Sequence, residues 1–316
     1  MEIVEKAEEV RRRLGEIRRA NRPIAFVPTM GAFHEGHLEL MRRAKAGLPA
    51  VASSPTITWR SGRAKAGPGA PLVVVSIFVN PTQFGPGEDY RTYPRDLEGD
   101  CEMAGTVGVD LIFVPSVEEI YPEGDSTIVE VGKLGEGMCG SHRPGHFRGV
   151  ATVVCKLFNI VQPNAAYFGE KDYQQLRIIE QMVRDLHMPV KIVPVPTVRE
   201  ADGLAMSSRN AYLSPEERRA APILYQGLLA AKSLAEKGER RAEALIEAVR
   251  RCVAKEPLFR LEYVELRDAQ TLENLTILDR PAVLALAARF GRARLIDNIV
   301  LCQGRIAHSE RKVDAG

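Results

Sequence analysis

Residues Pro28–His37 read PTMGAFHEGH and follow directly on the apolar run Ile24–Val27, which is a predicted buried strand. Two glycines in this stretch permit a tight turn, and a helix is predicted to begin after it. The free backbone N–H groups and the dipole at such a helix start favour phosphate. His34 and His37 lie three positions apart, so their imidazoles point the same way from the helix. The stretch therefore predicts an anion-binding turn that also carries acid chemistry.

The first part of the chain alternates strand-like and helix-like segments. The predicted strands are Ile24–Val27, Leu72–Val79, Leu111–Val114, Ala165–Phe168 and Val190–Val195. The predicted helices run over about Ile3–Ala20, from Gly36, from Pro94, over Val150–Val161 and over Lys171–His187. Because this alternation is typical of a parallel sheet with helices on both faces, we predict a doubly wound, Rossmann-like α/β domain over residues 1–197.

After Pro196 the pattern changes to helices followed by consecutive strands. Ser214 and Glu217 form a predicted capping box, with a proline at the first helical position, that opens a helix toward Ala235. A second helix is predicted at about Arg241–Ala254, followed by strands at Leu261–Arg267, Ala282–Ala288 and Ala293–Leu301. This order predicts a smaller C-terminal α+β domain over residues 198–316. Its closeness to the motif around Met206 suggests that it forms a lid on the anion site.

Residues 47–71 are rich in Ala, Gly, Ser and Pro and show no apolar period, so they predict an inserted surface loop. The loop contains Trp59, the only tryptophan of the chain, with basic neighbours. A partner-docking role and a tolerated insertion both fit this composition. Topology favours the insertion, since the segment joins a helix end to a strand start, at the sheet edge opposite the strand C-termini where ligands bind in such folds.

Composition limits the classes of protein to consider. The chain has 316 residues, of which 45% are hydrophobic and 27% charged, enough for two globular cores. The net charge of +2 indicates no nucleic-acid partner. No apolar stretch approaches transmembrane length, and the charged N-terminus does not resemble a signal peptide. The five cysteines contain no CxxC pair, which predicts reduced thiols, no zinc site and a cytoplasmic location.

Four further motifs follow the histidine motif in order along the chain. They are Val75–Gly85 (VSIFVNPTQFG), Arg143–Val150 (RPGHFRGV), Phe168–Leu176 (FGEKDYQQL) and Ala205–Asn210 (AMSSRN). Together with the HxGH pattern they resemble the pantothenate synthetase family, the pantoate and β-alanine ligases of the HxGH nucleotidyltransferase superfamily. The resemblance spans nearly the whole chain. Two departures are Phe33, where the family usually has leucine, and the 47–71 insertion.

The resemblance implies an ATP-dependent, AMP-forming ligase that makes pantothenate through a pantoyl adenylate. The catalytic residues it implies are His37, as proton donor, with His34 and Lys171. Met206–Arg209 would be the counterpart of the KMSKS loop, and Asp172 would hold the ribose hydroxyls. The implied ATP-binding residues are Met30, Gly31, Ala32, Phe33, His34, Glu35, Gly36, His37, Gly169, Glu170, Lys171, Asp172, Val198, Met206, Ser207, Ser208 and Arg209.

Gln83 and Gln175 are the implied pantoate- and β-alanine-binding residues, and neutral amides suit a small hydroxy acid because they both donate and accept. Mg²⁺ is expected because it screens the phosphates of ATP. The sequence shows no dedicated cage of carboxylates, so we assign no metal ligand. The resemblance also implies a homodimer through the first domain.

Several alternatives remain open from sequence alone. Asp172 could serve only to start a helix, Val198 could be a core valine, and the protonation states of His34 and His37 are not fixed. His142 and His146 are left unassigned in a glycine- and proline-containing loop. At the level of function, the alternatives are an HxGH adenylyltransferase that acts on a phosphate acceptor and a catalytically silent binding protein. The intact imidazole and basic groups favour an enzyme.

Overall fold

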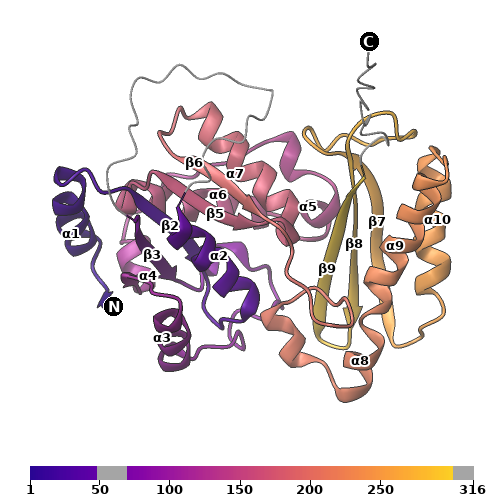
Figure 1. Cartoon of the computed structure of the whole chain (residues 1–316), viewed down its shortest axis with the longest axis horizontal. Coiled ribbons are helices and arrows are strands. Elements are labelled where there is room, and N and C mark those ends of the chain that lie inside the picture. Colours follow the sequence, from indigo (N-terminus) through magenta and orange to yellow (C-terminus); the bar gives the residue numbers. More distant parts are fainter. Residues whose placement is uncertain (48–69, 302–316) are drawn as a thin grey trace, which may run out of the picture.

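The computed structural model describes residues 1–47 and 70–301, which form one parallel and one antiparallel β-sheet (Figure 1). The parallel sheet and its helices make up one half of the view, and the antiparallel sheet with helices α9 and α10 makes up the other. The predicted fold class, a Rossmann-like sheet followed by a smaller α+β part, is confirmed. The predicted boundary at residues 197 and 198 falls after the last parallel strand and stays a prediction.

The parallel sheet has the order β1-β4-β3-β2-β5-β6, and each neighbouring pair is parallel. Its strands are β1 (Glu2–Val4), β2 (Ile24–Thr29), β3 (Leu72–Ile77), β4 (Leu111–Phe113), β5 (Ala165–Gly169) and β6 (Lys191–Val195). From β2 the chain builds outward to β3 and β4 on one side, and later to β5 and β6 on the other. The crevice at the carboxyl ends of β2 and β5 is therefore the topological switch point, where such sheets bind ligands.

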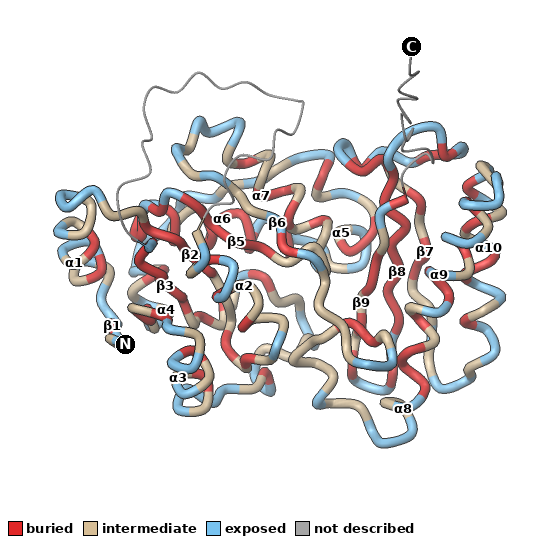
Figure 2. The backbone as a smooth tube through the Cα atoms, in the orientation of Figure 1, coloured by how far each residue is buried: buried red, intermediate tan, exposed pale blue. Residues whose placement is uncertain are grey.

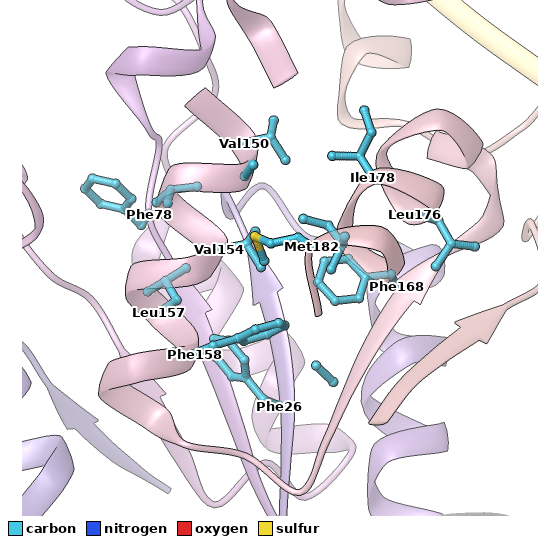
Figure 3. Close-up of a cluster of buried hydrophobic side chains, with 14 of the residues drawn as sticks. Phe26, Phe78, Val150, Val154, Leu157, Phe158, Phe168, Leu176, Ile178 and Met182 are labelled. Carbon is cyan, nitrogen blue, oxygen red and sulfur yellow. The ribbon is translucent and has the colours of Figure 1, made fainter. Parts of the chain in front are cut away.

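Helices cover both faces of this sheet because successive side chains of its strands point to opposite faces. Phe26 packs toward α1 and α6, whereas its neighbours Ala25 and Val27 pack toward α2 and α3. Figure 3 shows the first of these cores, in which Phe26, Phe158 and Phe168 meet. The helices are α1 (Ala7–Arg19), α2 (Glu35–Ala46), α3 (Leu97–Thr106), α4 (Val117–Ile120), α5 (Met138–His142), α6 (His146–Val161) and α7 (Tyr173–Asp185).

The C-terminal part is an antiparallel sheet in the order β7-β8-β9. Its elements are α8 (Pro215–Ala220), α9 (Ile223–Glu236), α10 (Ala242–Val253), β7 (Phe259–Asp268), β8 (Ala282–Phe290) and β9 (Ala293–Leu301). One face of the sheet packs on α9 and α10. The other face contributes Tyr263, Ala285 and Ala287 to a core shared with the first part. β8 is consequently buried along almost its whole length (Figure 2).

Two predicted helices, one near the N-terminus and one after Pro94, were wrong at their starts. The helix predicted over about Ile3–Ala20 is instead a short edge strand, β1, followed by α1 from Ala7. The side chain of Glu119 accepts a hydrogen bond from the Ala7 N–H at 2.9 Å and so fixes the start of this helix. The helix predicted from Pro94 begins only at Leu97, because Asp96 is its N-cap and accepts from the Gly99 N–H at 3.0 Å.

The helix predicted from Ser214 toward Ala235 is two helices. The capping box of Ser214 and Glu217 is confirmed and opens α8. α8 ends at Ala220 and α9 begins at Ile223, so the break lies at Pro222. Proline has no N–H for the helical ladder and its ring clashes with the preceding turn, which accounts for the break.

The predicted loop 47–71 lies almost entirely outside the described residues, and so does Trp59. The chain leaves the described part after Gly47, at the end of α2, and returns at Ala70 beside the start of β3. Arg22 donates to the Ala70 carbonyl at 2.9 Å, just before β2, so both ends lie at the N-terminal edge of the sheet. Among the helices of residues 1–47 and 70–301, none has the length and apolar character needed to cross a membrane.

Candidate active site

A cavity of about 220 Å³ lies at the switch point, where the carboxyl ends of β2, β3, β5 and β6 converge. Most of the predicted site residues line it, although they come from segments far apart in the sequence. These are Met30, His34, Gly36, His37, Gln83, Gly169, Lys171, Asp172, Gln175, Val198, Met206, Ser207, Ser208 and Arg209. Gly31, Ala32, Phe33, Glu35 and Glu170 belong to the same segments but not to the cavity wall.

The turn between β2 and α2 is held in place by Asp100 of α3. Its buried carboxylate accepts hydrogen bonds from the N–H groups of Ala32 at 2.9 Å and Phe33 at 2.6 Å. Gly31 has a φ of +82°, and a Cβ there would lie 2.8 Å from the Asp100 carboxylate, so glycine is required. Asp100 thus occupies the N–H groups of Ala32 and Phe33, which precede the helix start, and the expected binding of phosphate at the start of α2 itself stays a prediction.

His34 and His37 do come together, with ring centroids 4.2 Å apart. His34 is the N-cap of α2, and its Nδ1 accepts from the Gly36 N–H at 3.1 Å. Burial, followed by the charge of Lys171, lowers the pKa of His34 to about 4. Burial also holds the pKa of His37 well below its usual value. Both imidazoles are therefore neutral near pH 7, and the proton of His34 resides on Nε2, where it can be donated to a ligand.

Gln83 is held in place by Asn80, which belongs to the same VSIFVNPTQFG motif. Asn80 caps the single turn η1 (Pro81–Gln83) at the end of β3 and is 1% exposed. Its Nδ2 donates to Gln83 Oε1 and to the Gly149 carbonyl, both at 3.1 Å. Because the oxygen of the Gln83 amide is occupied, its Nε2 group, 3.1 Å from the Met30 sulfur, is the group presented to the cavity.

His146, which the sequence left unassigned, supports the same turn from the other side. Its Nδ1 lies 2.8 Å from the Gln83 carbonyl, and its Nε2 lies 2.9 Å from Arg143 Nη1. A neutral imidazole with the proton on Nδ1 satisfies both contacts, because Arg143 can only donate. Burial, followed by the charge of Arg143, lowers the pKa of His146 to about 3. This histidine thus holds the Gln83 backbone only in its neutral form.

The His146 arrangement predicts a loss of stability in mild acid. The pKa of His146 lies below its unfolded value of 6.5, so the unfolded chain binds more protons as the pH falls from about 6.5 toward 3. Between pH 7 and pH 5 this one group should lower the free energy of unfolding by about 2 kcal/mol. Urea denaturation at the two pH values should show that His146→Gln reduces the difference by that amount. His187→Asn, at an exposed position, is the matched control, and an equal reduction there would contradict the assignment.

Lys171 lies in the single turn η3 (Glu170–Asp172), directly after β5. Its Nζ is 3.6 Å from the Asp172 carboxylate, and the Asp172 side chain is 49% exposed on the cavity wall. Enclosure would raise the pKa of Asp172, but the charges of Lys171 and Arg209 outweigh it and keep the pKa below its usual value. Lys171 and Asp172 also line a second cavity of about 700 Å³ that extends toward the antiparallel sheet.

The segment Ser207–Arg209 forms a further part of the wall of the switch-point cavity. Ser207 caps the single turn η4 (Ser208–Tyr212), and Ser208 Oγ lies 3.1 Å from the Tyr93 hydroxyl. Arg209 makes a two-point ion pair with Asp89, at 3.0 and 2.9 Å. The guanidinium is therefore fixed at the junction of the two cavities, and its Nη1 group takes no part in this ion pair.

The adjacent glutamines of the QQ pair have different environments. Gln175 lines both cavities. Gln174 is 4% exposed, accepts from the Cys139 N–H at 3.0 Å and donates to the Leu134 carbonyl at 3.0 Å. Gln174 therefore fixes the loop before α5, and the sequence offered no signal for this role.

The chain matches the profile of a family described as pantoate-beta-alanine ligase over residues 2–54 and 63–300. The pantothenate synthetase of Thermosipho africanus is 50% identical over 301 residues, which are 95% of this chain and 100% of the relative. That of Pelotomaculum thermopropionicum is 52% identical over 295 residues, which are 93% of this chain and 97% of the relative. The chain belongs to the pantoate-beta-alanine ligase family.

Solved structures of pantoate-beta-alanine ligases share the fold. Pantothenate synthetase from Thermus thermophilus superposes with a TM-score of 0.83 at 47% identity, covering 95% of this chain and 99% of that chain. The pantoate-beta-alanine ligase from Francisella tularensis, complexed with beta-gamma ATP and beta-alanine, gives a TM-score of 0.72 at 33% identity, covering 95% of this chain and 97% of that chain. Membership of this ligase family confirms the reaction class predicted from the sequence, and it does not favour transfer of AMP to a phosphate acceptor.

Proposed function

We propose that the residues around the switch-point cavity carry out the ATP-dependent condensation of pantoate with β-alanine. The observation that supports these residue roles is the convergence of His34, His37, Lys171 and Arg209 on one cavity, beside Gln83 and Gln175. The donors and cations of this set suit a triphosphate, and its neutral amides suit a hydroxy acid.

In the first step the pantoate carboxylate attacks the α-phosphorus of ATP and pyrophosphate leaves. Negative charge then grows on the phosphate oxygens, and groups already fixed in place stabilise it without rearrangement. Lys171 supplies a point charge, while His34 donates from Nε2. The negative charge of bound ATP also favours protonation of the imidazoles, so His37 can act as the proton donor when the nucleotide is bound.

In the second step the β-alanine amine attacks the acyl carbon of pantoyl adenylate. The C–O bond to the phosphate breaks, AMP leaves, and the amine loses one proton as the amide forms. The adenylate is already activated, so no side chain forms a bond to the substrate. The protein's contribution is to hold the two reactants together and to keep water from the adenylate.

Gln83 and Gln175 are expected to bind pantoate and not ATP. Replacing either by alanine should raise the dissociation constant for pantoate about 10- to 100-fold, the effect of losing roughly 1.5–3 kcal/mol of hydrogen bonding to a charged group. Calorimetry should show ATP affinity nearly unchanged. Gln181→Ala, on the exposed side of α7, is the matched control. Equal losses for pantoate and ATP would indicate a collapsed pocket and contradict the assignment.

Mg²⁺, the homodimer and the cytoplasmic location also remain proposals. The acidic groups that line the large cavity are Glu88, Asp89, Asp172 and Asp297. Each of them already has a basic partner: Asp172 lies beside Lys171, and the other three pair with arginines. In residues 1–47 and 70–301, no three His, Cys, Asp or Glu side chains gather in a way that could hold a metal ion. Mg²⁺ would therefore be held mainly by the phosphates of ATP. Light scattering of the protein would test the dimer.

Pantoate-dependent exchange of labelled pyrophosphate into ATP tests the proposed reaction. Exchange should require pantoate and Mg²⁺ and proceed without β-alanine, because the adenylate forms before the amine reacts. A panel of related acids would establish substrate choice at the same time. Exchange that occurs without pantoate, or only with β-alanine present, would overturn this reaction order.

A further inference from the structure

Two adjacent polar residues, Asp297 and Asn298, interrupt the apolar run of β9. Both are buried, with exposed fractions of 4% and 7%. Successive side chains of a strand point to opposite faces of the sheet. The register partner of Asn298 is Ala285, which belongs to the core shared with the first part of the chain. A buried amide requires hydrogen-bond partners, and those of Asn298 lie across this boundary.

Asn298 Nδ2 donates to two successive backbone carbonyls, of Glu170 at 3.0 Å and of Lys171 at 2.9 Å. Both N–H groups of the amide are therefore used on η3, the turn that carries Lys171. Within the described part of the chain, no side chain caps η3 or the start of α7 that follows it. The antiparallel sheet thus supplies a direct restraint on the backbone from which the Lys171 side chain extends.

Asn298 is itself held firmly. Arg199 binds the Asp297 carboxylate through two nitrogens, at 2.7 and 2.8 Å, and its guanidinium lies 3.7 Å from the centroid of the Tyr225 ring. The same carboxylate accepts from the Asn298 N–H at 2.7 Å. Because this buried ion pair fixes the backbone of β9, the amide of Asn298 has a defined position against η3.

We propose that Asn298 is a positioning residue that sets the place of Lys171, so that the second part of the chain completes the phosphate-binding wall of the first. The proposal rests on the function proposed above for Lys171. The Lys171 side chain lines both cavities, so a shift of its backbone moves a charge relative to the triphosphate. A misplacement of about 1 Å is enough to cost a large part of the rate of such a reaction.

The test uses Asn298→Asp, which keeps the shape of the side chain but replaces the two N–H donors with oxygen that faces two carbonyls. The rate of pantoate-dependent pyrophosphate exchange should fall about tenfold or more, while the KM for pantoate changes less than about threefold. Thermal unfolding of each variant would show that it is folded. Asn298→Ala, which introduces no charge, takes the place of N298D if that variant does not fold.

A double-mutant cycle with Lys171→Ala gives the decisive measurement. If Asn298 acts through Lys171, the double variant should exchange at the rate of K171A alone, within about twofold. The proposal is overturned if adding N298D to K171A slows exchange by as much as N298D slows the parent enzyme. It is also overturned if N298D leaves the exchange rate of the parent unchanged. A parental rate for K171A itself would instead overturn the proposed role of Lys171, so the two failures are distinguishable.

Tyr173→Phe is the matched control for a general loosening between the two parts. It removes the hydrogen bond from the Tyr173 hydroxyl to the Ala269 carbonyl, which spans 2.8 Å across the same boundary. Tyr173 follows η3 directly, but this bond is made by its side-chain hydroxyl and its loss leaves both bonds from Asn298 to the η3 carbonyls in place. The variant should keep its exchange rate within about twofold of the parent, and a loss equal to that of N298D would overturn the specific role of Asn298.

Discussion

Replacing Lys171 by alanine is expected to lower the rate of pantoyl adenylate formation about 100- to 1000-fold. The ammonium group lies at the end of β5, where it lines the cavity together with both histidines. A fixed cation or donor at a developing phosphate charge typically contributes about 3–4 kcal/mol to the transition state. Rapid-quench measurement of adenylate formation in a single turnover gives the rate of this step directly.

The control for this experiment is Lys45→Ala. Lys45 lies near the end of α2 and pairs with Asp110 at 3.0 Å, on the side of the sheet remote from the strand C-termini. Its loss should leave the single-turnover rate within about twofold of the parent, since surface ion pairs contribute only about 0–1 kcal/mol. An unchanged rate in K171A, with normal unfolding, would remove Lys171 from the mechanism.

The sequence predicted the fold because its strongest signals, apolar runs and helical periods, are local and extend over several residues. The near-continuous apolar run of Leu72–Val79 predicts a strand buried on both faces, and β3, which ends at Ile77, is buried in this way. Short or edge elements gave weaker signals. β1 has only three residues, too few to show an alternation, and its pairing with β4 depends on a strand more than one hundred residues later.

The site was predictable where its chemistry lies in contiguous motifs, as for His34, Lys171 and Arg209. It was not predictable where one residue acts on another at a distance. Asp100 is 68 residues from Ala32, and nothing in its own helix marks it as the residue that fixes the β2–α2 turn. Asn298 offered a usable signal, because two adjacent polar residues break the alternation of a buried strand.

Gly149 is a motif residue whose importance shows only in its contacts with a distant turn. Gly149 belongs to the RPGHFRGV motif and lies in the first part of α6. A Cβ at this position would lie 2.4 Å from the Thr82 carbonyl oxygen and 2.7 Å from the Gln83 nitrogen. Both are backbone atoms of η1, which cannot rotate away as a side chain could. The methyl group must therefore displace the turn that presents Gln83 to the cavity.

Gly149→Ala is expected to raise the KM for pantoate about tenfold or more, the consequence of losing at least roughly 1.4 kcal/mol of binding. The same overpacking should lower the free energy of unfolding by about 1–3 kcal/mol. Steady-state kinetics and urea denaturation measure the two effects separately.

The matched control is Gly15→Ala in α1, because within the described residues the added Cβ would meet no atom of another part of the fold within 4 Å. Alanine in a helix interior is favoured over glycine by about 1 kcal/mol, so this variant should be slightly more stable and kinetically unchanged. The sign of the stability change therefore separates the two glycines, although the substitution is the same. A G149A variant that loses stability but keeps the parental KM for pantoate would show that η1 can move without disturbing Gln83, and would contradict the substrate-reading role of that turn.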